Sequence, residues 1–182
     1  MMERIRIGQI GIGHNHGSEK MNTLRRLSDL FEVVGVVEDD PQWRRRRGDW
    51  ECYRGIPWMS EEELFRVPGL QAVAVETDGF GLVPAARRCA EHNLHIHMDK
   101  PGGESLDEFE RRKLCIQLGY MYRNNPAIRF CRDAVRKGWL GEIFEIHAVM
   151  SRYDGGDEDY RRWLSNFRGG AMYIFGGHLI DI

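Results

Sequence analysis

The chain has 182 residues and a formal net charge of −2, so its acidic and basic residues are nearly in balance. This balance offers no broad positive surface for nucleic acid or for an anionic membrane. No apolar run approaches the roughly 20 residues that cross a bilayer, and the N-terminus lacks the apolar core of a signal peptide. We therefore expect a cytoplasmic protein with no nucleic-acid or membrane partner. Its 4 cysteines form no CxxC pair, which favours reduced thiols over disulfides or a zinc site.

The first predicted elements are a strand, Ile5 to Ile10, and a helix, about Asn15 to Leu27, joined by a glycine turn. The dinucleotide-binding fingerprint requires this order of strand, turn and helix. Gly11 permits a tight turn, and Gly13 permits backbone N–H groups to approach a pyrophosphate at the positive end of the helix dipole. The third glycine position of the fingerprint is His16, so the match is partial. The alternative is an ordinary glycine-rich turn between a strand and a helix.

A second predicted strand, Phe31 to Val37, ends in an acidic run that begins at Glu38. Glu38 lies roughly 20 residues past the turn, where the acid that binds the adenosine ribose is expected. A carboxylate there accepts hydrogen bonds from the ribose 2′-hydroxyl and repels a 2′-phosphate, so the sequence favours NAD. NADP stays possible, because one of the arginines Arg44 to Arg47 could contact a 2′-phosphate. The alternatives are a solvated loop for the acidic run and a solvated helix face for the arginines.

Strands and helices continue to alternate along the chain. The predicted elements are strands at Gly69 to Val75, Leu94 to Met98 and Leu114 to Gly119, with helices at about Val83 to His92 and Ser105 to Arg112. This order predicts an α/β fold, a doubly wound parallel sheet whose ligands bind at the carboxyl ends of the strands. Glu38, Thr77 and Lys100 each follow such an end, so we expect them to converge on one crevice.

Several motifs farther along the chain are more specific. They are Thr77 in a loop after a strand, Asp99-Lys100-Pro101 after the next strand, Gly119-Tyr120-Met121-Tyr122-Arg123, Gly138-Trp139-Leu140-Gly141-Glu142, and a stretch from Gly169-Gly170 to His178-Leu179-Ile180-Asp181. Together with the opening turn they resemble the NAD(P)-dependent oxidoreductase family that includes glucose-fructose oxidoreductase and inositol dehydrogenase (Gfo/Idh/MocA). The resemblance implies an N-terminal Rossmann domain and a lysine beside the nicotinamide and the substrate.

The resemblance also implies roles for particular residues. Lys100 would polarise the reacting oxygen, His178 would take the proton of the substrate hydroxyl, and Tyr122 would join His178 at the substrate. The cofactor, NAD or alternatively NADP, would be contacted by Gly11, Gly13, His14, Asn15, Glu38, Thr77, Asp99 and Lys100. Taken alone, Lys100 could be a surface lysine. Its place before Pro101 and a pair of glycines favours the functional interpretation.

We expect no metal site. His95 and His97 point to one face of their predicted strand, as a chelating pair would, but no third ligand is near them in the sequence. We therefore interpret both as structural. His14 and His16 flank the phosphate turn and are expected to line the cofactor site rather than to bind a metal.

The predicted domains are residues 1–121, which bind NAD(P), and residues 122–182, the beginning of an α+β substrate and oligomerisation domain. The resemblance implies a large open antiparallel sheet in this second domain, through which the full-length protein forms a dimer or tetramer. The sequence predicts a helix at about Pro126 to Lys137, a strand at about Gly141 to Ser151, and the start of a helix from Gly170 to Ile182. One strand and two helices cannot bury a sheet face, so we expect the sequence to be part of a longer chain.

The chain departs from the family at one position of the predicted site. The family commonly has an aspartate four residues before the histidine, and here that position is Ile174. On an α-helix the two positions share a face, and an isoleucine cannot orient the imidazole of His178 as a carboxylate does. Asp181 could reach the same face of the helix.

Three functions remain open from the sequence. The first is an oxidoreductase that transfers a hydride between NAD(P) and a hydroxyl-bearing carbon of a carbohydrate-like substrate, namely a sugar, polyol or cyclitol. The second is a glycosidase-type enzyme of the same family, in which NAD is reduced only transiently. The third is a non-catalytic nucleotide-binding sensor, which Ile174 favours.

Overall fold

A computed structural model describes residues 3–100, 102, 116–151, 158–167 and 169–182 of the chain. The chain divides into two compact units, Met1–Gly119 and Tyr120–Ile182. The helix predicted from Ser105 to Arg112 lies outside the described residues, as do the first two residues of the strand predicted from Leu114. Across the described residues, no helix combines the length and the apolar composition that crossing a bilayer requires.

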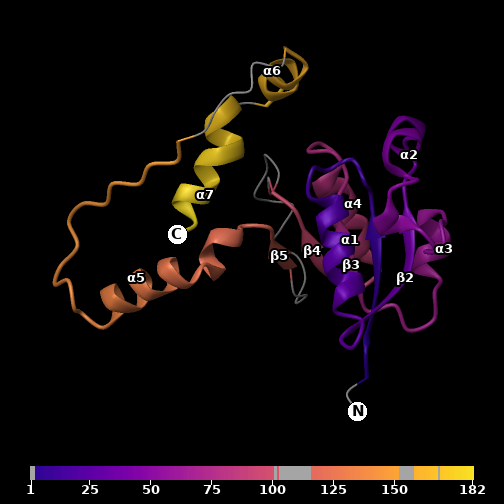
Figure 1. The fold of residues 1–182 in the computed structure, drawn as a ribbon, viewed down its shortest axis with the longest axis horizontal. Coiled ribbons are helices and arrows are strands. Elements are labelled where there is room, and N and C mark those ends of the chain that lie inside the picture. The colour runs from indigo at the N-terminus through magenta and orange to yellow at the C-terminus, as the bar shows by residue number, and fades with distance from the viewer. Residues whose placement is uncertain (1–2, 101, 103–115, 152–157, 168) are drawn as a thin grey trace. The chain divides into compact units, whose positions relative to one another are not determined.

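The first unit is built on a parallel sheet of five strands in the order β2-β1-β3-β4-β5 (Figure 1). The strands are β1 (Ile5–Ile10), β2 (Phe31–Val37), β3 (Ala72–Val75), β4 (His95–Met98) and β5 (Ile116–Leu118). The helical segments are α1 (Gly17–Arg26), α2 (Pro41–Arg47), the 3-10 turn η1 (Glu51–Tyr53), α3 (Glu61–Phe65) and α4 (Leu82–Glu91). The predicted α/β fold is confirmed, although β3 and β4 are shorter than the apolar runs that predicted them.

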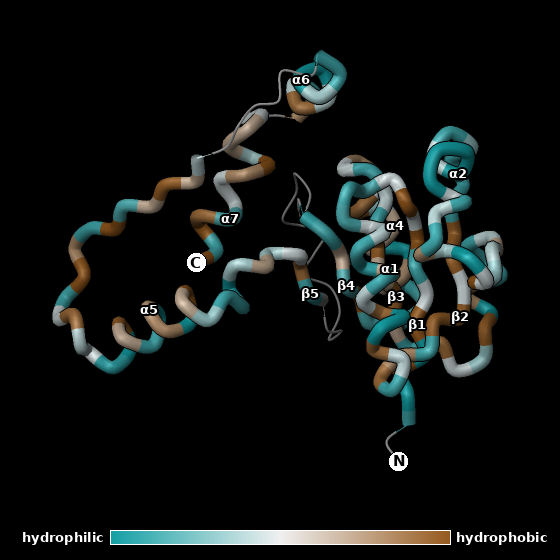
Figure 2. The backbone as a smooth tube through the Cα atoms, in the orientation of Figure 1, coloured by the Kyte–Doolittle hydropathy of each residue, from teal (hydrophilic) through white to brown (hydrophobic). Residues whose placement is uncertain are grey.

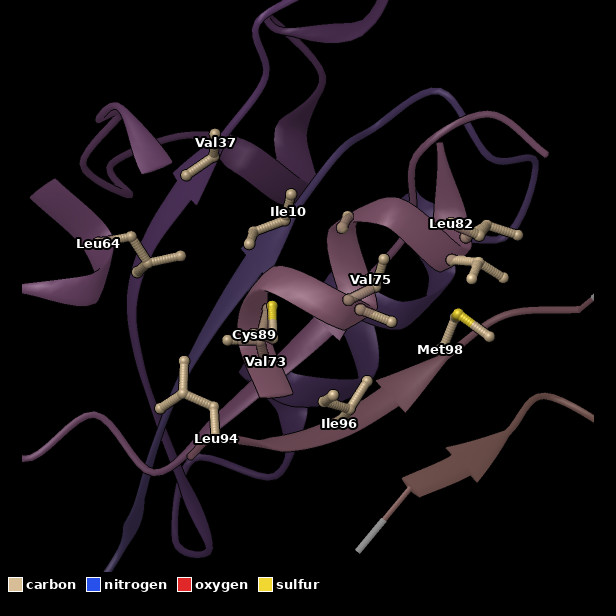
Figure 3. Close-up of a cluster of buried hydrophobic side chains, with 13 residues drawn as sticks. Ile10, Val37, Leu64, Val73, Val75, Leu82, Cys89, Leu94, Ile96 and Met98 are labelled. Atoms are coloured by element: carbon tan, nitrogen blue, oxygen red, sulfur yellow. The ribbon is translucent and has the colours of Figure 1, made fainter. Parts of the chain in front are cut away.

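Helices cover both faces of this sheet. Successive side chains of a strand point to opposite faces. Val73 and Val75 of β3 therefore pack with α4 on one face, where Figure 3 shows side chains of four strands gathered against this helix. On the other face, Ala74 of β3 and Ile7 of β1 pack against Leu24 of α1. The sheet is thus doubly wound, as the sequence predicts.

The sheet is extended from β1 in both directions, with β2 on one side and β3, β4 and β5 on the other. The connections after β1 and β3 therefore run to opposite sides of this point. In open α/β sheets such a point leaves a crevice at the carboxyl ends of the strands, and ligands bind there. The segments that follow β1 and β3 are the glycine turn and the loop that begins at Glu76. The fold therefore brings these two segments together at the switch point.

Local sequence signals set the starts of the helices around this crevice. The carboxylate of Asp40 accepts a hydrogen bond from the N–H of Gln42 at 2.7 Å, and Pro41 occupies the first turn of α2. The acidic run after β2 is thus a short loop that leads into α2, and Asp39 and Asp40 are exposed in it, as the alternative interpretation has it. Helix α1 begins at Gly17, two residues later than predicted, and buries Met21 and Leu24 along one face.

The described part of the second unit is helical. Its elements are the 3-10 turn η2 (Met121–Asn124), α5 (Pro126–Arg136), α6 (Glu158–Ser165), the π-helical turn η3 (Met172–Gly176) and α7 (Gly177–Ile180). Helix α5 matches the helix predicted there. It starts at Asn125, whose side chain accepts a hydrogen bond from the N–H of Ala127 at 2.9 Å.

The strand predicted from Gly141 to Ser151 is wrong. This segment has no regular secondary structure, and Figure 2 shows its apolar positions alternating with polar ones along an extended course. Phe144 is 94% exposed and Val149 is 86% exposed. An alternating pattern gives a segment the tendency to form a strand, but a ladder also requires a partner strand. Within the described residues of this unit there is none.

Candidate functional site

The glycine turn after β1 depends on the conformation of Gly11. Its φ of +87° lies in the region that favours glycine, and a Cβ there would fall 2.4 Å from the backbone nitrogen of Thr77. The N–H of Gly11 donates to the carbonyl of Val37 at 2.8 Å. Only glycine at this position permits the turn to lie against both the end of β2 and the loop after β3.

Glu38 reaches across from the end of β2 to the same turn. One carboxylate oxygen accepts a hydrogen bond from the N–H of Ile12 at 2.7 Å, and the other accepts from the N–H of Asp40 at 2.9 Å. Burial raises the pKa of this carboxyl, and these two backbone donors oppose the increase. The acid predicted to bind the ribose therefore lies directly beside the turn predicted to bind the pyrophosphate.

Two of the arginines of α2 are half-buried and contact other parts of the chain, so they do not belong to a solvated helix face. Nη1 of Arg47 donates to the carbonyls of Ile12, Gly13 and His14 at 2.9, 3.1 and 2.8 Å. The guanidinium of Arg44 lies over the ring of Trp58, 3.1 Å from its centroid. Arg45 and Arg46 are exposed, as predicted for a solvated face.

The N–H groups of the turn divide into two sets. The N–H of His14 donates to the carbonyl of Glu76 at 2.9 Å, and the N–H of His16 donates to Nδ1 of His14 at 3.2 Å. In the part of the chain that the structure describes, the N–H groups of Gly13 and Asn15 have no protein acceptor. Two backbone donors beside the N-terminus of a helix are the ordinary means of binding an anion.

Imidazole and carboxylate groups gather at the carboxyl ends of β1, β3 and β4. We call this set the acid–imidazole cluster, and its members are His14, His16, Glu76 and Asp99. The Nδ1 atoms of His16 and His14 lie 2.9 and 3.4 Å from Oδ2 of Asp99. Nδ1 of His14 is also 3.7 Å from Oε2 of Glu76. The side chains of Glu76 and Asp99 are 0% and 2% exposed, so the cluster is buried on its carboxylate side.

The surroundings of this cluster lower the pKa values of His14 and Asp99 and raise that of Glu76. Burial lowers the pKa of His14 to about 4, which keeps the ring neutral. Burial, together with the charge of Asp99, raises the pKa of Glu76 to about 8. Burial acts on Asp99 in the same upward sense, but the hydrogen bond from His16 and the neighbouring imidazoles outweigh it and lower its pKa to about 2. At neutral pH the negative charge of the cluster is therefore concentrated on Asp99.

Glu76 is a polar residue that sequence reasoning missed. Its carboxylate is fully buried directly after β3. Gln9 of β1 was also missed, and its side-chain amide donates to the carbonyl of Gly11 at 2.9 Å. The available signal for both was a polar residue next to or inside an apolar strand at the switch point, where ligands bind.

Lys100 and Thr77 lie at strand ends, as predicted. The N–H of Lys100 donates to Oδ1 of Asp99 at 2.7 Å, so Asp99 fixes the backbone at this point. The hydroxyl of Thr77 donates to the carbonyl of Asp78 at 3.1 Å. Pro101, which was expected to make the backbone after Lys100 rigid, lies outside the described residues.

The two histidines of β4 have different surroundings. His95 is exposed, whereas His97 contacts Nζ of Lys20 and the side-chain oxygen of Gln117. Burial lowers the pKa of His97, and the charge of Lys20 acts in the same direction. The contacts of His97 agree with its structural interpretation, and the interpretation of His95 stays a prediction.

In the second unit, His178 lies between two tyrosine rings. The rings of Tyr120 and Tyr122 are 5.4 and 5.3 Å from that of His178, both close to edge-on. His178 is 5% exposed. A Cβ at Gly177 would lie 2.8 Å from the hydroxyl of Tyr120, so a glycine there permits this close approach. Tyr120 was not singled out by the sequence, although it stands two residues from Tyr122 in the same motif.

The helix that carries His178 is not a regular α-helix. The π-helical turn from Met172 to Gly176 changes the angular spacing, so Ile174 and His178 do not share a face in the way that i and i+4 positions of an α-helix do. Asp181 pairs with Arg123, which donates to it from Nε at 2.9 Å. The carboxylate of Asp181 is therefore held by Arg123, and its support of His178 stays a prediction.

All of the residues predicted to contact the cofactor belong to the first unit, whereas Tyr122 and His178 belong to the second. Gly11, Gly13, His14 and Asn15 form the turn, and Glu38 lies against it. The loop after β3 carries Thr77, and the end of β4 carries Asp99 and Lys100. A parallel sheet with a glycine turn at its switch point and an acid at the end of the second strand defines a Rossmann-type nucleotide-binding unit.

Comparison with known proteins agrees with this class. The chain is 25% identical over 191 residues to the rhizopine catabolism protein MocA of Rhizobium meliloti, a match that covers 99% of this chain and 56% of MocA. It is 25% identical over 147 residues to inositol 2-dehydrogenase of Rubrobacter xylanophilus, covering 76% of this chain and 42% of that protein. The chain thus spans about half the length of the curated relatives that it matches. No family model matches it.

Solved structures have the same fold. A Desulfitobacterium hafniense protein that is proposed to be an NADPH-dependent oxidoreductase superposes with a TM-score of 0.79 at 21% identity, covering 100% of this chain and 54% of that one. Scyllo-inositol dehydrogenase of Lactobacillus casei superposes with a TM-score of 0.62 at 17% identity, covering 78% and 43%. The relatives, MocA and an inositol dehydrogenase among them, make the chain similar to the Gfo/Idh/MocA family of oxidoreductases.

Proposed function

We propose that this chain is the cofactor-binding part of an NAD-dependent oxidoreductase that acts on a hydroxyl group of a sugar, polyol or cyclitol. The observation that carries the proposal is the contact between Glu38 and the N–H of Ile12 at 2.7 Å, beside a turn whose Gly13 and Asn15 N–H groups are open. Two relatives support the substrate class. One is an inositol 2-dehydrogenase, and the L. casei enzyme was solved with NAD(H) and scyllo-inositol.

The residues of the first unit suit a dinucleotide. The open N–H groups of Gly13 and Asn15 would hold the pyrophosphate, near the N-terminus of α1. Each oxygen of Glu38 accepts one backbone hydrogen bond and retains a lone pair for a ribose hydroxyl. The negative charge of Glu38 disfavours a 2′-phosphate, and Arg44 is stacked on Trp58, so the proposal specifies NAD over NADP.

In the proposed reaction, bound NAD supplies an acceptor for the hydride of the carbinol carbon. The ammonium of Lys100 would hydrogen-bond to the reacting oxygen and stabilise the negative charge that forms on it. The imidazole of His178 would take the hydroxyl proton, which is the role of a general base. Tyr120 and Tyr122, whose rings lie against His178, would hold the imidazole in place.

Calorimetry with NAD and NADP tests the cofactor assignment. We expect NAD to bind more tightly, and Glu38→Ala to weaken NAD binding by roughly 10-fold, as for the loss of a charged hydrogen-bond acceptor. Glu32→Ala is the matched control, since Glu32 lies on β2, the strand that leads to Glu38, but pairs with Arg4 and Arg6 at the surface. A clear preference for NADP, with Glu38→Ala leaving NAD affinity unchanged, would refute the assignment.

Steady-state kinetics tests the roles of Lys100 and His178. If each acts in the transition state, replacement by alanine should lower kcat and kcat/KM together, by about 10²- to 10⁴-fold, and leave cofactor affinity nearly unchanged. We expect the larger loss for Lys100→Ala, because no carboxylate supports His178 at position 174, and a partial gain for Ile174→Asp. Lys137→Ala is the control. Unchanged turnover in Lys100→Ala would remove its catalytic role.

A nucleotide-binding sensor is the second candidate, and the burial of Ile174 favours it. This side chain is 2% exposed in the helix that carries His178, where the family commonly has an aspartate. A sensor would bind NAD tightly and show no turnover with any of a broad panel of polyols. Net NADH production with a simple polyol would exclude it, and would equally exclude a glycosidase with transient redox.

We also propose that the protein is a homo-oligomer. Phe130, Phe144 and Ile146 of the second unit are 64%, 94% and 80% exposed in the isolated chain. Exposed apolar side chains in such numbers are typical of surfaces that associate. Sedimentation of the intact protein as a monomer at micromolar concentration would contradict this.

A further inference from the structure

The acid–imidazole cluster combines four potential metal ligands, and it was not expected from the sequence to bind a metal. Its members follow three neighbouring strands: His14 and His16 follow β1, Glu76 follows β3 and Asp99 follows β4. Strands β1, β3 and β4 are adjacent in the sheet (Figure 1). The fold thus collects side chains from positions 14 to 99 at one point, which is how buried metal centres are assembled.

The spacing of the donor atoms matches that of a small coordination sphere. One donor atom from each of His14, His16 and Asp99 lies within 4.8 Å of the other two. Nδ1 of His14 is 3.4 Å from Asp99 Oδ2 and 3.7 Å from Glu76 Oε2. Tetrahedral ligands at the usual zinc bond lengths of about 2.0–2.2 Å are separated from one another by about 3.3–3.6 Å. The donor atoms of His14, His16 and Asp99 therefore need only small movements to surround an ion, and Glu76 approaches them from the side of His14.

The carboxylate of Glu76 supplies an independent observation. It is 0% exposed, and neither of its oxygens has a hydrogen-bond partner among the described residues. A buried carboxylate without hydrogen bonds is costly, and such groups in native proteins are usually protonated, hydrated or bound to a cation. Its nearest recorded polar contact is with His14, so the carboxylate faces the cluster.

The chemical state of His14 also suits a ligand. Nδ1 of this ring accepts the N–H of His16 at 3.2 Å, so this nitrogen carries a lone pair and the ring is in the tautomer that can donate it to a metal. That lone pair faces two carboxylates, at 3.4 and 3.7 Å. The lone pair of His14 and the carboxylate of Asp99 repel each other in this arrangement unless a positive charge lies between them.

We propose that His14, His16 and Asp99, with Glu76 as the fourth ligand, bind one divalent first-row transition-metal ion such as Zn²⁺. Two imidazoles and two carboxylates form a mixed nitrogen and oxygen site, which suits ions of this class better than Ca²⁺ or Mg²⁺, because these prefer oxygen ligands alone. Binding displaces the proton that His16 shares with Asp99, and it replaces the contact between the His16 N–H and His14.

The test is a titration of the purified, metal-free chain with Co²⁺, followed by visible absorption, with Zn²⁺ then added as a competitor. We expect saturation at one ion per chain and displacement by Zn²⁺. His16→Ala and Asp99→Asn should each weaken binding by roughly 100-fold, and Glu76→Gln by roughly 10-fold. His95→Ala is the matched control, since this exposed histidine on β4 should leave the affinity unchanged.

Two further measurements keep the result clear. Far-UV circular dichroism of each metal-free variant shows whether it is folded, and Zn²⁺ should raise the melting temperature of the wild type and of His95→Ala but not of His16→Ala. No saturable binding by the wild type, or binding that survives both His16→Ala and Asp99→Asn, overturns the proposal. Because the titration contains no nucleotide, its failure is distinguishable from failure of the proposed oxidoreductase function.

Discussion

The two units bury their apolar side chains to very different degrees. In the first unit the sheet is covered on both faces, and Val73, Val75 and Leu82 are completely buried. In the second unit, Phe144 and Ile146 lie in a segment without regular structure and are largely exposed. Figure 2 shows hydrophobic positions along this segment. A parallel sheet with helices on both faces completes its core within one unit. Among the described residues of the second unit, helices and an extended segment leave many large apolar side chains exposed.

The largest expected difference between the units is in thiol reactivity. Cys89 of α4 is 0% exposed, and burial raises its pKa to about 12, so only a small fraction of this thiol is thiolate near neutral pH. Cys131 of α5 is exposed. Labelling at about pH 8, followed by peptide mass spectrometry, should be about 10³-fold slower at Cys89, since it requires opening of the core. Equal rates would mean that the first unit opens as easily as the second.

Truncation of leucines should show the next largest difference. Leu82→Ala removes a completely buried side chain from the core of Figure 3 and should lower the free energy of unfolding by about 2–5 kcal/mol. Leu140→Ala changes a side chain that is 61% exposed in the second unit, and the expected effect is within about 0.5 kcal/mol. Denaturant unfolding of both variants measures the difference. A comparable loss in Leu140→Ala would show that this side chain is covered in solution.

Gly138 and Gly11 both have a positive φ, but only Gly11 is crowded by neighbouring atoms. Comparing their alanine variants therefore separates the energetic cost of the backbone conformation from that of steric overlap. Gly138 in the second unit has a φ of +72°, and a Cβ added there would meet nothing within 4 Å, so Gly138→Ala should cost about 1 kcal/mol from its conformation alone. At Gly11 the added Cβ would also overlap the backbone of Thr77, which should cost about 1–3 kcal/mol more. Thermal unfolding compares the two variants. Equal destabilisation would mean that the loop of Thr77 moves away from the added Cβ at no measurable cost.

The smallest difference is expected for ion pairs at the surface. Arg88 contacts both oxygens of Glu61, at 2.5 and 2.8 Å, and Glu61 is 16% exposed. Arg162 and Glu158 of α6 approach only to 3.5 Å and are largely exposed. Arg88→Ala should therefore destabilise the protein by up to about 1 kcal/mol, and Arg162→Ala by about 0.3 kcal/mol or less. Urea midpoints decide this, and the reverse order would count against the geometric explanation.

The sequence predicted the parts of the molecule that local patterns determine. The turn at Gly11 and the acid at Glu38 were placed correctly, because a strand, a turn and an acid follow one another at a spacing that the fold requires. The strand at residues 141–151 was predicted wrongly for the complementary reason. Alternation is a local pattern, whereas the hydrogen bonds of a strand come from elsewhere in the structure.

The parts that the sequence did not predict involve contacts between distant residues. The burial of Glu76 was not predicted, because nothing near it in the sequence indicates that His14 and Asp99 approach it in space. The arginines of α2 looked equivalent, but only Arg47 reaches the carbonyls of the turn. Such contacts depend on how strands are ordered in the sheet, which periodicity does not determine.

Arg47 has a consequence for how the glycine turn presents itself to a ligand. A trans peptide unit holds each carbonyl antiparallel to the N–H of the next residue. Because Nη1 of Arg47 gathers the carbonyls of Ile12, Gly13 and His14, the N–H groups of the following residues, which include Gly13 and Asn15, point to the other side. These peptide dipoles are therefore oriented during folding, and an arriving anion does not have to reorient them. The preference of the turn for negative charge is thus a property of α2 as much as of the glycines.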